Sequence, residues 1–407
     1  TSWRRRSRSN WGRLGMKSKT YLLGDICKFI DYRGKTPPKT TSGVPLVTAK
    51  IVKNGAIQKP QEFIAENFYD EWMRRGIPKK GSVVFTTEAP LGEVAQIKTN
   101  AKLAFAQRII VLEPNQEYLD ETYLFYALQD SVLKSRIDAR ASGTTVIGIK
   151  SAELKKVEID VPPLSVQQKI AGILSVIDSK IALNNKINDN LEQQAETLFQ
   201  NLFIDNARPE WKQGTICDLG TVVGGSTPSK SKPEYYTDTG IAWITPKDLS
   251  VNKSKFIYHG ENDITELGLK NSSASIMPEG TVLFSSRAPI GYTAIAAGEV
   301  TTNQGFKSIV PKPEIGTAFV YYFLKYNLPV IEGMASGSTF KEVSGATMKK
   351  VPAFIPDAET LNKFRRFCEP LFAQQKVLEI QNESLAELRD SLLPKLMAGE
   401  IDVENIK

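Results

Sequence analysis

The chain has 407 residues, of which 41% are hydrophobic and 24% are charged, and its formal net charge is +7. This length predicts two or three domains with the composition of an ordinary globular protein. The chain contains no run of 18 apolar residues, which excludes a transmembrane helix.

The first fifteen residues differ from the rest of the chain. Residues 1–15 contain five Arg and no acidic residue, and Met16 follows them. They lack the apolar core of a secretory signal, and we interpret them as a non-native or disordered extension. The alternative is a basic arm that touches nucleic acid. Without these arginines the net charge falls to +2, so any nucleic-acid-binding surface in the body has to be a local patch.

Residues 16–163 are predicted to form a first, sheet-rich domain. Apolar runs at 44–47, 82–85 and 103–112 lie between Gly/Pro turns, a pattern that predicts strands. A helix is expected at 121–137, and a polar loop follows it. The domain is therefore expected to belong to the α+β class.

Residues 164–205 are predicted to form a central long helix, running from about 165 to 203. Pro163 precedes it, and Ser165 is its expected N-cap. Apolar residues recur at alternating spacings of four and three, the signature of a coiled-coil seam. The seam positions are Ile170, Leu174, Ile177, Ile181, Asn184, Asn188, Leu191, Ala195, Leu198 and Leu202.

Residues 206–356 are predicted to form a second domain of the same kind, with strands at 241–244 and 281–284 and a helix at 317–331. Residues 357–407 are predicted to form a C-terminal long helix, from about 359 to 397, and a tail. Asp357 is its expected N-cap. Its seam positions are Phe364, Cys368, Leu371, Gln375, Leu378, Asn382, Leu385, Arg389, Leu392 and Leu396.

The two halves of the chain repeat with an offset of 194 residues, which every seam position and the Ala-Ser-Gly loops at 141–143 and 335–337 keep. A repeat of this size predicts two copies of one unit. We therefore expect two sheet-rich domains separated by two long helices that form an antiparallel coiled coil. The polar seam residues either fix the register or bond a partner helix. Amide side chains such as Gln167, Gln193 and Gln374 are expected on the outer faces.

Hydroxyl, amide and basic side chains gather in the loops that both halves retain. Hydroxyls donate to phosphate, Arg binds guanine in a bidentate manner, and Gly143 and Gly337 permit a positive φ. The alternative is that these loops are structural turns with solvated charges. The candidate DNA contacts are Arg33, Lys35, Thr36, Thr86, Thr87, Gln107, Arg108, Arg140, Ser142, Thr144 and Thr145 in the first domain, and Ser226, Thr227, Lys247, Ser285, Ser286, Arg287, Gln304, Ser336, Ser338, Thr339 and Lys341 in the second.

The sequence contains no recognisable catalytic cluster. Cys27, Cys217 and Cys368 lie far apart and form no CxxC pair, which suits a reducing cytoplasm. The single histidine, His259, is too little for a His-based metal site. Neither a GxxxxGK[ST] loop nor GxGxxG after a strand occurs. We therefore expect no catalytic residue, no metal and no cofactor in this chain, and a binding module rather than an enzyme.

Several runs of this sequence resemble the DNA-specificity subunit of Type I restriction-modification systems. Residues 164–174, 177–181 and 392–401 look like the central and C-terminal helical regions of that family. Residues 244–249 and 287–291 look like motifs of its target-recognition domains. The individual motifs are loose, but their order and duplication are specific.

The resemblance covers about residues 20–400 and implies that each domain reads one half of a split DNA target. It also implies that the helices set the gap and dock two methyltransferase subunits, which bring S-adenosylmethionine and methylate adenine. A motor-nuclease subunit can join for restriction. The first copy departs from the pattern because Glu88 stands where the second has Arg287, which puts a shared DNA role of this position in doubt.

Three hypotheses follow from the sequence. The first is a DNA-reading adaptor, which predicts sequence-specific and salt-dependent duplex binding. The second is a protein-only coiled-coil scaffold without DNA readout, which the mild charge of the body favours. The third is a nucleic-acid enzyme, which the missing catalytic clusters disfavour.

Overall fold

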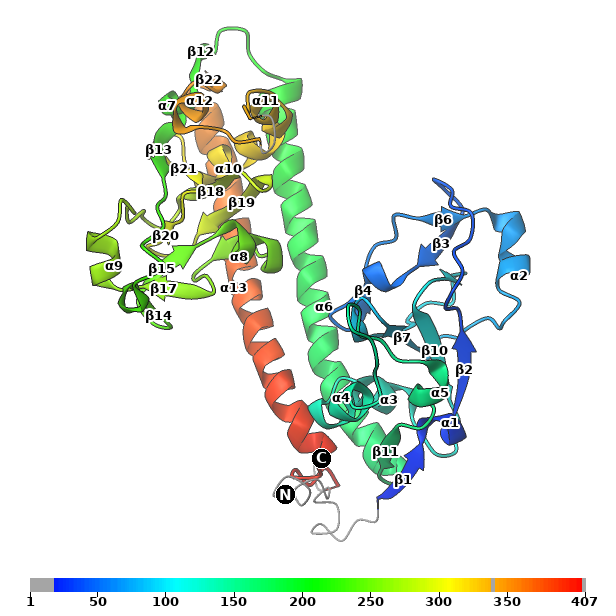
Figure 1. Ribbon diagram of the computed structural model, residues 1–407. Coiled ribbons are helices and arrows are strands. Elements are labelled where there is room, and N and C mark those ends of the chain that lie inside the picture. Colours follow the sequence, from blue (N-terminus) through cyan, green and yellow to red (C-terminus); the bar gives the residue numbers. More distant parts are fainter. Residues whose placement is uncertain (1–17, 338–340, 405–407) are drawn as a thin grey trace. The chain divides into compact units, whose positions relative to one another are not determined.

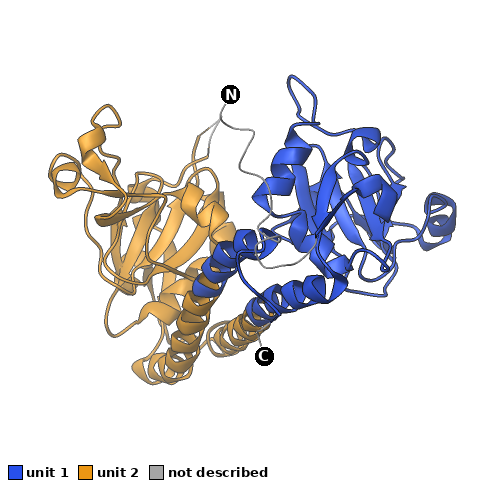
Figure 2. Cartoon of the chain, turned by 90° about the horizontal axis from the view of Figure 1, so that it is seen from below, with its two compact units in different colours: residues 1–181, 384–407 blue, residues 182–383 orange. Residues whose placement is uncertain are grey.

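The computed structural model describes residues 18–337 and 341–404, and it divides into two compact units (Figure 2). Unit 1 comprises residues 1–181 and 384–407, and unit 2 comprises residues 182–383. Each unit therefore combines one sheet-rich domain with a part of each long helix. Among the described residues, no helix is long and apolar enough to cross a membrane.

Unit 1 is built on a four-stranded antiparallel sheet in the order β2-β10-β7-β8 (Figure 1). A ladder of β1 with β11, the sheet β6-β3-β9 and a hairpin of β4 with β5 complete its strands. The elements are β1 (Lys19–Leu22), α1 (Leu23–Ile26), β2 (Cys27–Asp31), β3 (Val44–Val47), β4 (Val52–Lys53), β5 (Ala56–Ile57), β6 (Phe63–Ile64), α2 (Tyr69–Trp72), β7 (Val83–Thr87), β8 (Leu91–Gln96), β9 (Ala104–Phe105), β10 (Ile109–Pro114), α3 (Glu121–Ala127), α4 (Ser131–Asp138), α5 (Ser151–Leu154) and β11 (Glu158–Val161).

Unit 2 repeats this plan with a five-stranded sheet in the order β13-β21-β18-β19-β16, a second sheet β14-β17-β15-β20 and a ladder of β12 with β22. Its elements are β12 (Lys212–Thr215), α7 (Ile216–Leu219), β13 (Gly220–Gly224), β14 (Tyr236–Thr237), β15 (Ile241–Ile244), α8 (Pro246–Val251), β16 (Phe256–Ile257), β17 (Asn262–Ile264), α9 (Glu266–Lys270), β18 (Val282–Ser286), β19 (Ile290–Ala296), β20 (Thr301–Thr302), β21 (Lys307–Pro311), α10 (Thr317–Tyr326), α11 (Leu328–Gly333), α12 (Gly345–Lys349) and β22 (Pro352–Ile355).

The central strand of each main sheet is buried on both faces. Side chains alternate across a strand, so Val83 and Phe85 enter the core beneath α3, whereas Val84 enters a second core under β3 and β9. In unit 2, Val282 and Phe284 join the core that contains α10, and Leu283 joins the smaller core beside β15. Burial on both faces explains why these strands read as continuous apolar runs.

The two long helices are α6 (Leu164–Gln200), which continues as a π-helical turn over Asn201–Asp205, and α13 (Ala358–Met397). Every predicted seam position of both helices is buried or half-buried, so the expected seam is confirmed.

The two helices pair in antiparallel fashion within unit 2. Asn184 Nδ2 donates to Asn382 Oδ1 at 2.9 Å, and Gln375 Nε2 donates to the backbone oxygen of Asn188 at 3.2 Å. Partner numbers on α13 thus fall as numbers on α6 rise. The polar seam residues bond one another across the pair, which favours their role in fixing the register.

Unit 1 contains a contact of the same kind between the other parts of the helices. Arg389 of α13 donates to Asp178 of α6 at 3.0 Å. Leu396 of α13 joins Ile170 and Leu174 of α6 in the domain core. In both units, therefore, the seam is continuous with the core of the adjoining domain.

The predicted caps differ in outcome. Asp357 Oδ1 accepts from Thr360 N at 2.8 Å, which confirms the N-cap of α13. Ser165 does not cap α6, because that helix begins at Leu164 and the carbonyl of Pro163 accepts its first N–H groups.

The expectation that Gln167 lies on an outer face is also wrong. Gln167 is fully buried and spans the helix start and the preceding loop. Its Nε2 donates to the backbone oxygens of Tyr118 and Pro162 at 2.9 and 2.8 Å, and its Oε1 accepts from Asp120 N at 2.8 Å. The amide therefore satisfies buried backbone groups that apolar side chains would leave unpaired.

Replacing Asp357 with Ala is expected to lower the free energy of unfolding by about 1–2 kcal/mol, because the first turn of α13 loses its cap. Chemical denaturation at pH 7 measures the change. Ser165→Ala is the matched control at the start of α6 and should change stability by less than about 0.5 kcal/mol. Equal effects of the two substitutions would contradict this assignment of the caps.

Candidate nucleic-acid interface

A short hairpin in unit 1 docks against the end of the central strand β7. Ser142 and Gly148 exchange backbone hydrogen bonds of 2.8 and 3.0 Å, and Ile149 N donates to Thr87 O at 2.9 Å. Gly143 has a φ of 134°, and a Cβ there would lie 2.1 Å from a carbonyl oxygen across the hairpin. The predicted positive φ is confirmed, and only glycine fits this turn.

Unit 2 holds the corresponding hairpin in the same way. Ser336 and Glu342 exchange backbone hydrogen bonds of 3.1 and 2.9 Å, and Val343 N donates to Ser286 O at 3.0 Å. Gly337 has a φ of 117°. Both copies thus carry one backbone frame, while the side chains on it differ.

The hairpin of unit 1 borders a polar hollow of about 400 Å³. Its walls come from the loop after β2, the end of β7, the loop before β10 and the hairpin itself, so four segments distant in sequence meet there. The lining residues are Arg33, Gly34, Thr87, Glu88, Gln107, Arg108, Ser142, Gly148, Ile149 and Lys150.

The hollow brings together five of the predicted contacts: Arg33, Thr87, Gln107, Arg108 and Ser142. Gln107 and Ser142 are exposed, and the Arg108 side chain is 43% exposed. Gln107 and Arg108 adopt left-handed φ values of 41° and 64°, which non-glycine residues rarely take. Such strain collects at functional sites, where the surroundings hold it in place.

The predicted DNA contacts did not include two charged residues that line the hollow, Glu88 and Lys150. Glu88 Oε1 lies 3.0 Å from Arg108 Nε, so the position that departs from the second copy pairs with a predicted contact. Lys150 is exposed beside the hairpin. Position in the repeat was the available signal for Glu88, but its partner lies on a distant loop.

Arg33 is held at the rim of the hollow by Asp31. Its guanidinium donates to both oxygens of that carboxylate at 2.6–3.1 Å. Burial opposes the charge of Asp31, but the guanidinium of Arg33 outweighs burial and lowers the pKa of Asp31. Part of the Arg33 fork is thus already engaged, and the rest remains available to a ligand.

Several predicted hydroxyl contacts are wrong because their side chains point inward. Thr86 and Ser285 are fully buried, and each Oγ donates to the carbonyl of the proline four residues later, at 2.7 and 2.8 Å. Ser286 is also fully buried and donates to Gly305 O. Thr87 is 2% exposed and contributes mainly its backbone to the frame. These residues shape the turn rather than offer a contact surface.

The remaining predicted residues of unit 1 are exposed but do not line the hollow. Lys35 and Thr36 follow Arg33 on the surface, and Thr144 and Thr145 lie at the hairpin tip. Arg140 is exposed and pairs with a carboxylate of α5 at 3.2 Å. Their DNA roles remain predictions.

In unit 2, the predicted residues lie on the loop after β13, on α8, on the loop before β21, at the end of β18 and on the hairpin. Thr227 donates to Gln304 Oε1, which links the loop after β13 to the loop before β21. Ser226 Oγ accepts a backbone hydrogen bond of 3.3 Å, and Lys247 pairs with an exposed carboxylate at 2.5 Å. Arg287 is half-exposed. Ser336 and Lys341 are exposed, and Ser338 and Thr339 lie outside the described residues.

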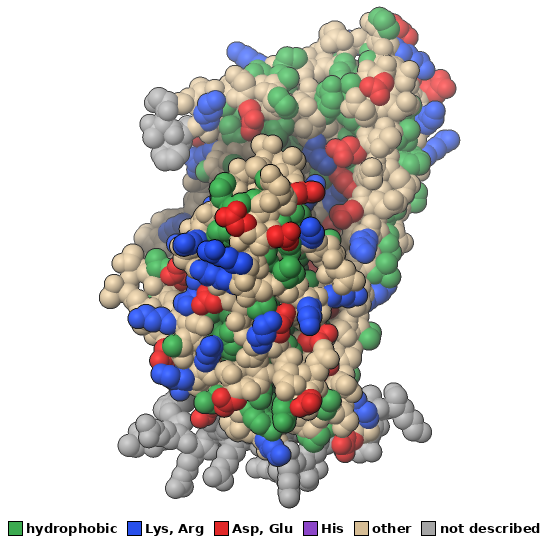
Figure 3. All heavy atoms as spheres, turned by 90° about the vertical axis from the view of Figure 1, so that its right-hand side faces the viewer, with side chains coloured by type: hydrophobic (Ala, Val, Ile, Leu, Met, Phe, Trp, Pro, Cys, Tyr) green, Lys and Arg blue, Asp and Glu red, His purple; other side chains and the backbone are tan. Residues whose placement is uncertain are grey.

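Basic side chains do not form one continuous patch on the face drawn in Figure 3, where Lys and Arg are interleaved with Asp and Glu. This pattern agrees with the modest charge of the body and favours local contacts. Within 18–337 and 341–404, no group of three or more His, Cys, Asp or Glu side chains is placed to hold a metal ion.

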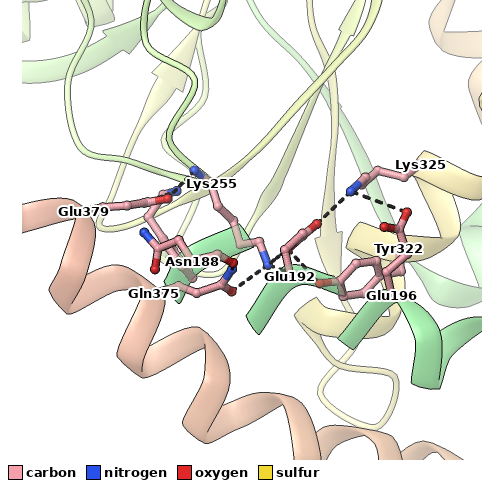
Figure 4. Close-up of polar contacts among 9 residues, drawn as sticks. Asn188, Glu192, Glu196, Lys255, Tyr322, Lys325, Gln375 and Glu379 are labelled. Atoms are coloured by element: carbon pink, nitrogen blue, oxygen red, sulfur yellow. Dashed lines mark hydrogen bonds and ion pairs between the residues drawn. The ribbon is translucent and has the colours of Figure 1, made fainter. Parts of the chain in front are cut away.

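A buried lysine joins the domain of unit 2 to both long helices (Figure 4). The Lys255 side chain is 5% exposed, and its Nζ pairs with Glu192 of α6. It also donates to Gln375 Oε1 of α13 at 2.8 Å and to Tyr322 Oη of α10 at 3.2 Å. Glu379 of α13 accepts from the backbone N–H of the same residue at 2.8 Å. This junction fixes how the domain meets its helix pair.

The charge of Glu192 is supported by two lysines. Lys325 Nζ lies 2.7 Å from Glu192 Oε1, in addition to the pair with Lys255. Burial alone would raise the pKa of Glu192, but the two ammonium groups outweigh it and lower the pKa to about 2. The carboxylate is therefore ionised at neutral pH.

Unit 1 has a similar junction, in which a tyrosine of the domain also bonds a carboxylate of α6 but the positively charged partner is different. Tyr126 Oη donates to Asp178 Oδ2 of α6 at 2.6 Å, and Arg389 of α13 donates to Asp178 Oδ1 at 3.0 Å. Tyr322 bonds Glu192 in the same manner at 2.9 Å in unit 2. Each domain is thus connected through a tyrosine to a carboxylate of α6.

A family model described as "Type I restriction modification DNA specificity domain" matches residues 16–193 and 209–389. The chain is 42% identical to the Type I restriction enzyme MjaIX specificity subunit of Methanocaldococcus jannaschii over 170 residues, which are 41% of this chain and 39% of that protein. It is 24% identical to the HindI specificity subunit of Haemophilus influenzae over 403 residues, or 79% of this chain and 87% of that protein.

A crystal structure of the S subunit of a Type I restriction-modification system from M. genitalium superposes with a TM-score of 0.59. The match covers 94% of this chain and 96% of that one at 17% identity. It supports the fold of two α+β domains with long helices.

Replacing Lys255 with Met should lower the free energy of unfolding by about 3 kcal/mol at pH 7, because one partner of a buried ion pair is lost. The folded-state pKa of Glu192, about 2, lies below its unfolded value of about 4.3. Its stabilisation is therefore complete above the unfolded pKa and is lost as the pH falls through the folded one. The difference in the free energy of unfolding between the wild-type protein and Lys255→Met should therefore be smaller at pH 3 than at pH 7.

The matched control is Lys247→Met, which removes an exposed ion pair in the same domain and should cost less than about 1 kcal/mol. Chemical denaturation at pH 7 and at pH 3 measures the free energy of unfolding of the wild-type protein and of both variants. A difference for Lys255→Met that stays constant between pH 7 and pH 3 would contradict the role of the pair with Glu192.

Proposed function

The chain belongs to the Type I restriction-modification DNA-specificity family, and on that premise we propose that it reads a bipartite DNA target, one half-site per domain. The observation that carries the proposal is the duplicated hairpin frame. Ser142 and Gly148 in one domain, and Ser336 and Glu342 in the other, make the same backbone hydrogen bonds, while the side chains around them differ. Equal frames with different side chains suit the reading of two different sequences.

Each domain would contact the duplex with the loops around its hairpin. In the first domain the polar hollow offers Arg33, Gln107 and Arg108, which are side chains suited to base edges and phosphates. In the second domain the corresponding loops offer Arg287 and Gln304. The modest net charge means that phosphate contacts would position the domains locally, and binding would weaken with rising salt.

The long helices would dock two methyltransferase subunits. Large apolar side chains are exposed along both helices outside the buried seam, and such side chains in water mark interaction surfaces when they gather. On α6 these are Val176, Leu183 and Ile187, and on α13 they are Phe367, Val377, Ile380 and Leu388.

Catalysis would belong to these partners, which would bind S-adenosylmethionine and methylate adenine, and a motor-nuclease subunit could join them for restriction. The one histidine, His259, is exposed at the surface of unit 2 and lies 3.3 Å from Asp263. A protein-only scaffold would explain the apolar side chains of the helices, but it would not explain two diverged loop sets on one frame.

Methylome sequencing of the host, with and without the gene for this chain, tests the proposal. We expect methyladenine in one split motif, which disappears on deletion and returns when the wild-type chain is restored. An unchanged methylome, with the complex shown to assemble by size-exclusion chromatography, would contradict DNA readout and favour the scaffold.

A further inference from the structure

The two copies of the hairpin frame carry opposite charges at one equivalent position. Glu88 forms a β-bridge with Gly148 in unit 1, and Arg287 forms a β-bridge with Glu342 in unit 2. Both residues directly follow the central strand of their sheet. The backbone register shows that Glu88 and Arg287 occupy the same place, although one is an acid and the other a base.

Each of these residues pairs with a side chain of the opposite charge. Glu88 lies 3.0 Å from Arg108, and Arg287 lies 3.5 Å from Glu342. The exposed fractions of the four side chains lie between 37% and 43%. Ion pairs this exposed contribute little to folding stability, so the fold does not depend on either of them.

The partners come from different loops. Arg108 lies on the loop before β10, whereas Glu342 lies on the hairpin. An acid next to an arginine is therefore present in both copies, although only the position at the strand end, residue 88 or 287, is shared by the two pairs.

The backbone holds Arg108 in a conformation that the fold alone would avoid. Its φ of 64° and the φ of 41° at Gln107 lie in the left-handed region, which costs of the order of 1 kcal/mol or more per non-glycine residue. A backbone hydrogen bond of 2.8 Å from Thr87 N to Arg108 O fixes this turn against the strand end. The guanidinium is thereby presented at the mouth of the hollow beside Glu88.

The chemistry of an adjacent acid and arginine matches one base pair in particular. In the major groove, a C·G pair presents an amino donor on cytosine N4 next to the acceptors O6 and N7 of guanine. Glu accepts from cytosine N4, and Arg donates in a bidentate manner to guanine. One carboxylate and one guanidinium held side by side therefore complement the whole edge of a C·G pair.

We propose that the pairs Glu88–Arg108 and Arg287–Glu342 are specificity determinants, each of which reads one C·G base pair in the half-site of its domain. The inference rests on the proposed function. Because the shared position at the strand end is an acid in the first copy and an arginine in the second, residue 88 faces cytosine in the first half-site. The equivalent position of residue 287 faces guanine in the second.

The test uses the complete chain with its methyltransferase partners, in a host where it is the sole specificity subunit. The methylated motif is sequenced for wild type, Glu88→Gln and Arg108→Lys. Both variants should relax the same single C·G pair of one half-site by about 10- to 100-fold, the discrimination of one bidentate contact. Glu88→Gln should shift the preference toward adenine, because Gln both donates to N7 and accepts from N6 of that base.

A matched control removes another ion pair of the first domain, whose charged atoms are separated by the same distance as those of Glu88 and Arg108. Lys28 and Glu113 lie 3.0 Å apart at the opposite end of the β2–β10 ladder from the hollow, so Glu113→Gln should leave the motif unchanged. Arg287→Lys and Glu342→Gln repeat the experiment for the other half-site. If a variant methylates nothing, its assembled complex is titrated with duplexes that carry each base substitution, to measure the same discrimination.

The outcomes separate the two proposals. Relaxation of one shared C·G pair by both members of an ion pair supports the inference. An unchanged motif, or relaxation at two unrelated positions, overturns it and leaves the proposed function intact. A wild-type chain that directs no methylation although its complex assembles overturns the proposed function and the inference together.

Discussion

The buried seam between α6 and α13 is the interaction on which both units depend. A helix of this length with polar residues at several seam positions is marginal in water unless it is packed. In unit 2, Phe199 of α6 and Phe364 of α13 belong to the same core as Phe319 of α10. The helix pair and the domain thus share one hydrophobic core, and disruption of the seam would damage both. Each domain is in this way attached to its helices through a shared core.

The junctions between domains and helices show what duplication preserves and what it changes. Tyr126 and Tyr322 hold equivalent places on α3 and α10, and each donates to a carboxylate of α6. The positive partner of that carboxylate differs: Arg389 comes from α13, whereas Lys255 comes from the domain itself. The tyrosine contact is present in both units, whereas the positive charge that pairs with the carboxylate comes from a different element in each unit.

The architecture was largely predictable from the sequence because its signals are periodic or repeated. The alternating four-three spacing identified the seam of both helices, and the offset of the repeat identified the two domains. Local chemistry was sufficient for the cap at Asp357. It failed at Ser165, because the carbonyl of Pro163 accepts the first N–H groups of α6 instead.

The candidate site was predictable only in part. The sequence identified the loops, and five of the predicted residues meet in one hollow. It could not tell that Thr86 and Ser285 point inward, because the direction of a side chain at a strand end depends on the turn that follows. It also could not pair Glu88 with Arg108 or Lys255 with Glu192, since these partners meet only through tertiary packing. Ion pairs between residues distant in sequence therefore could not be predicted from the sequence.

Site-directed DNA cleavage would show whether each domain contacts its own half-site. An iron chelate would be attached to a cysteine introduced at the hairpin of one domain, Thr144→Cys or Ser336→Cys, with the exposed Cys217 replaced by Ser. Within the assembled complex on its target duplex, we expect cleavage in one half-site from Thr144→Cys and in the other from Ser336→Cys. Cleavage of the same half-site by both, or no cleavage above the Cys217→Ser control while the complex remains bound, would contradict it.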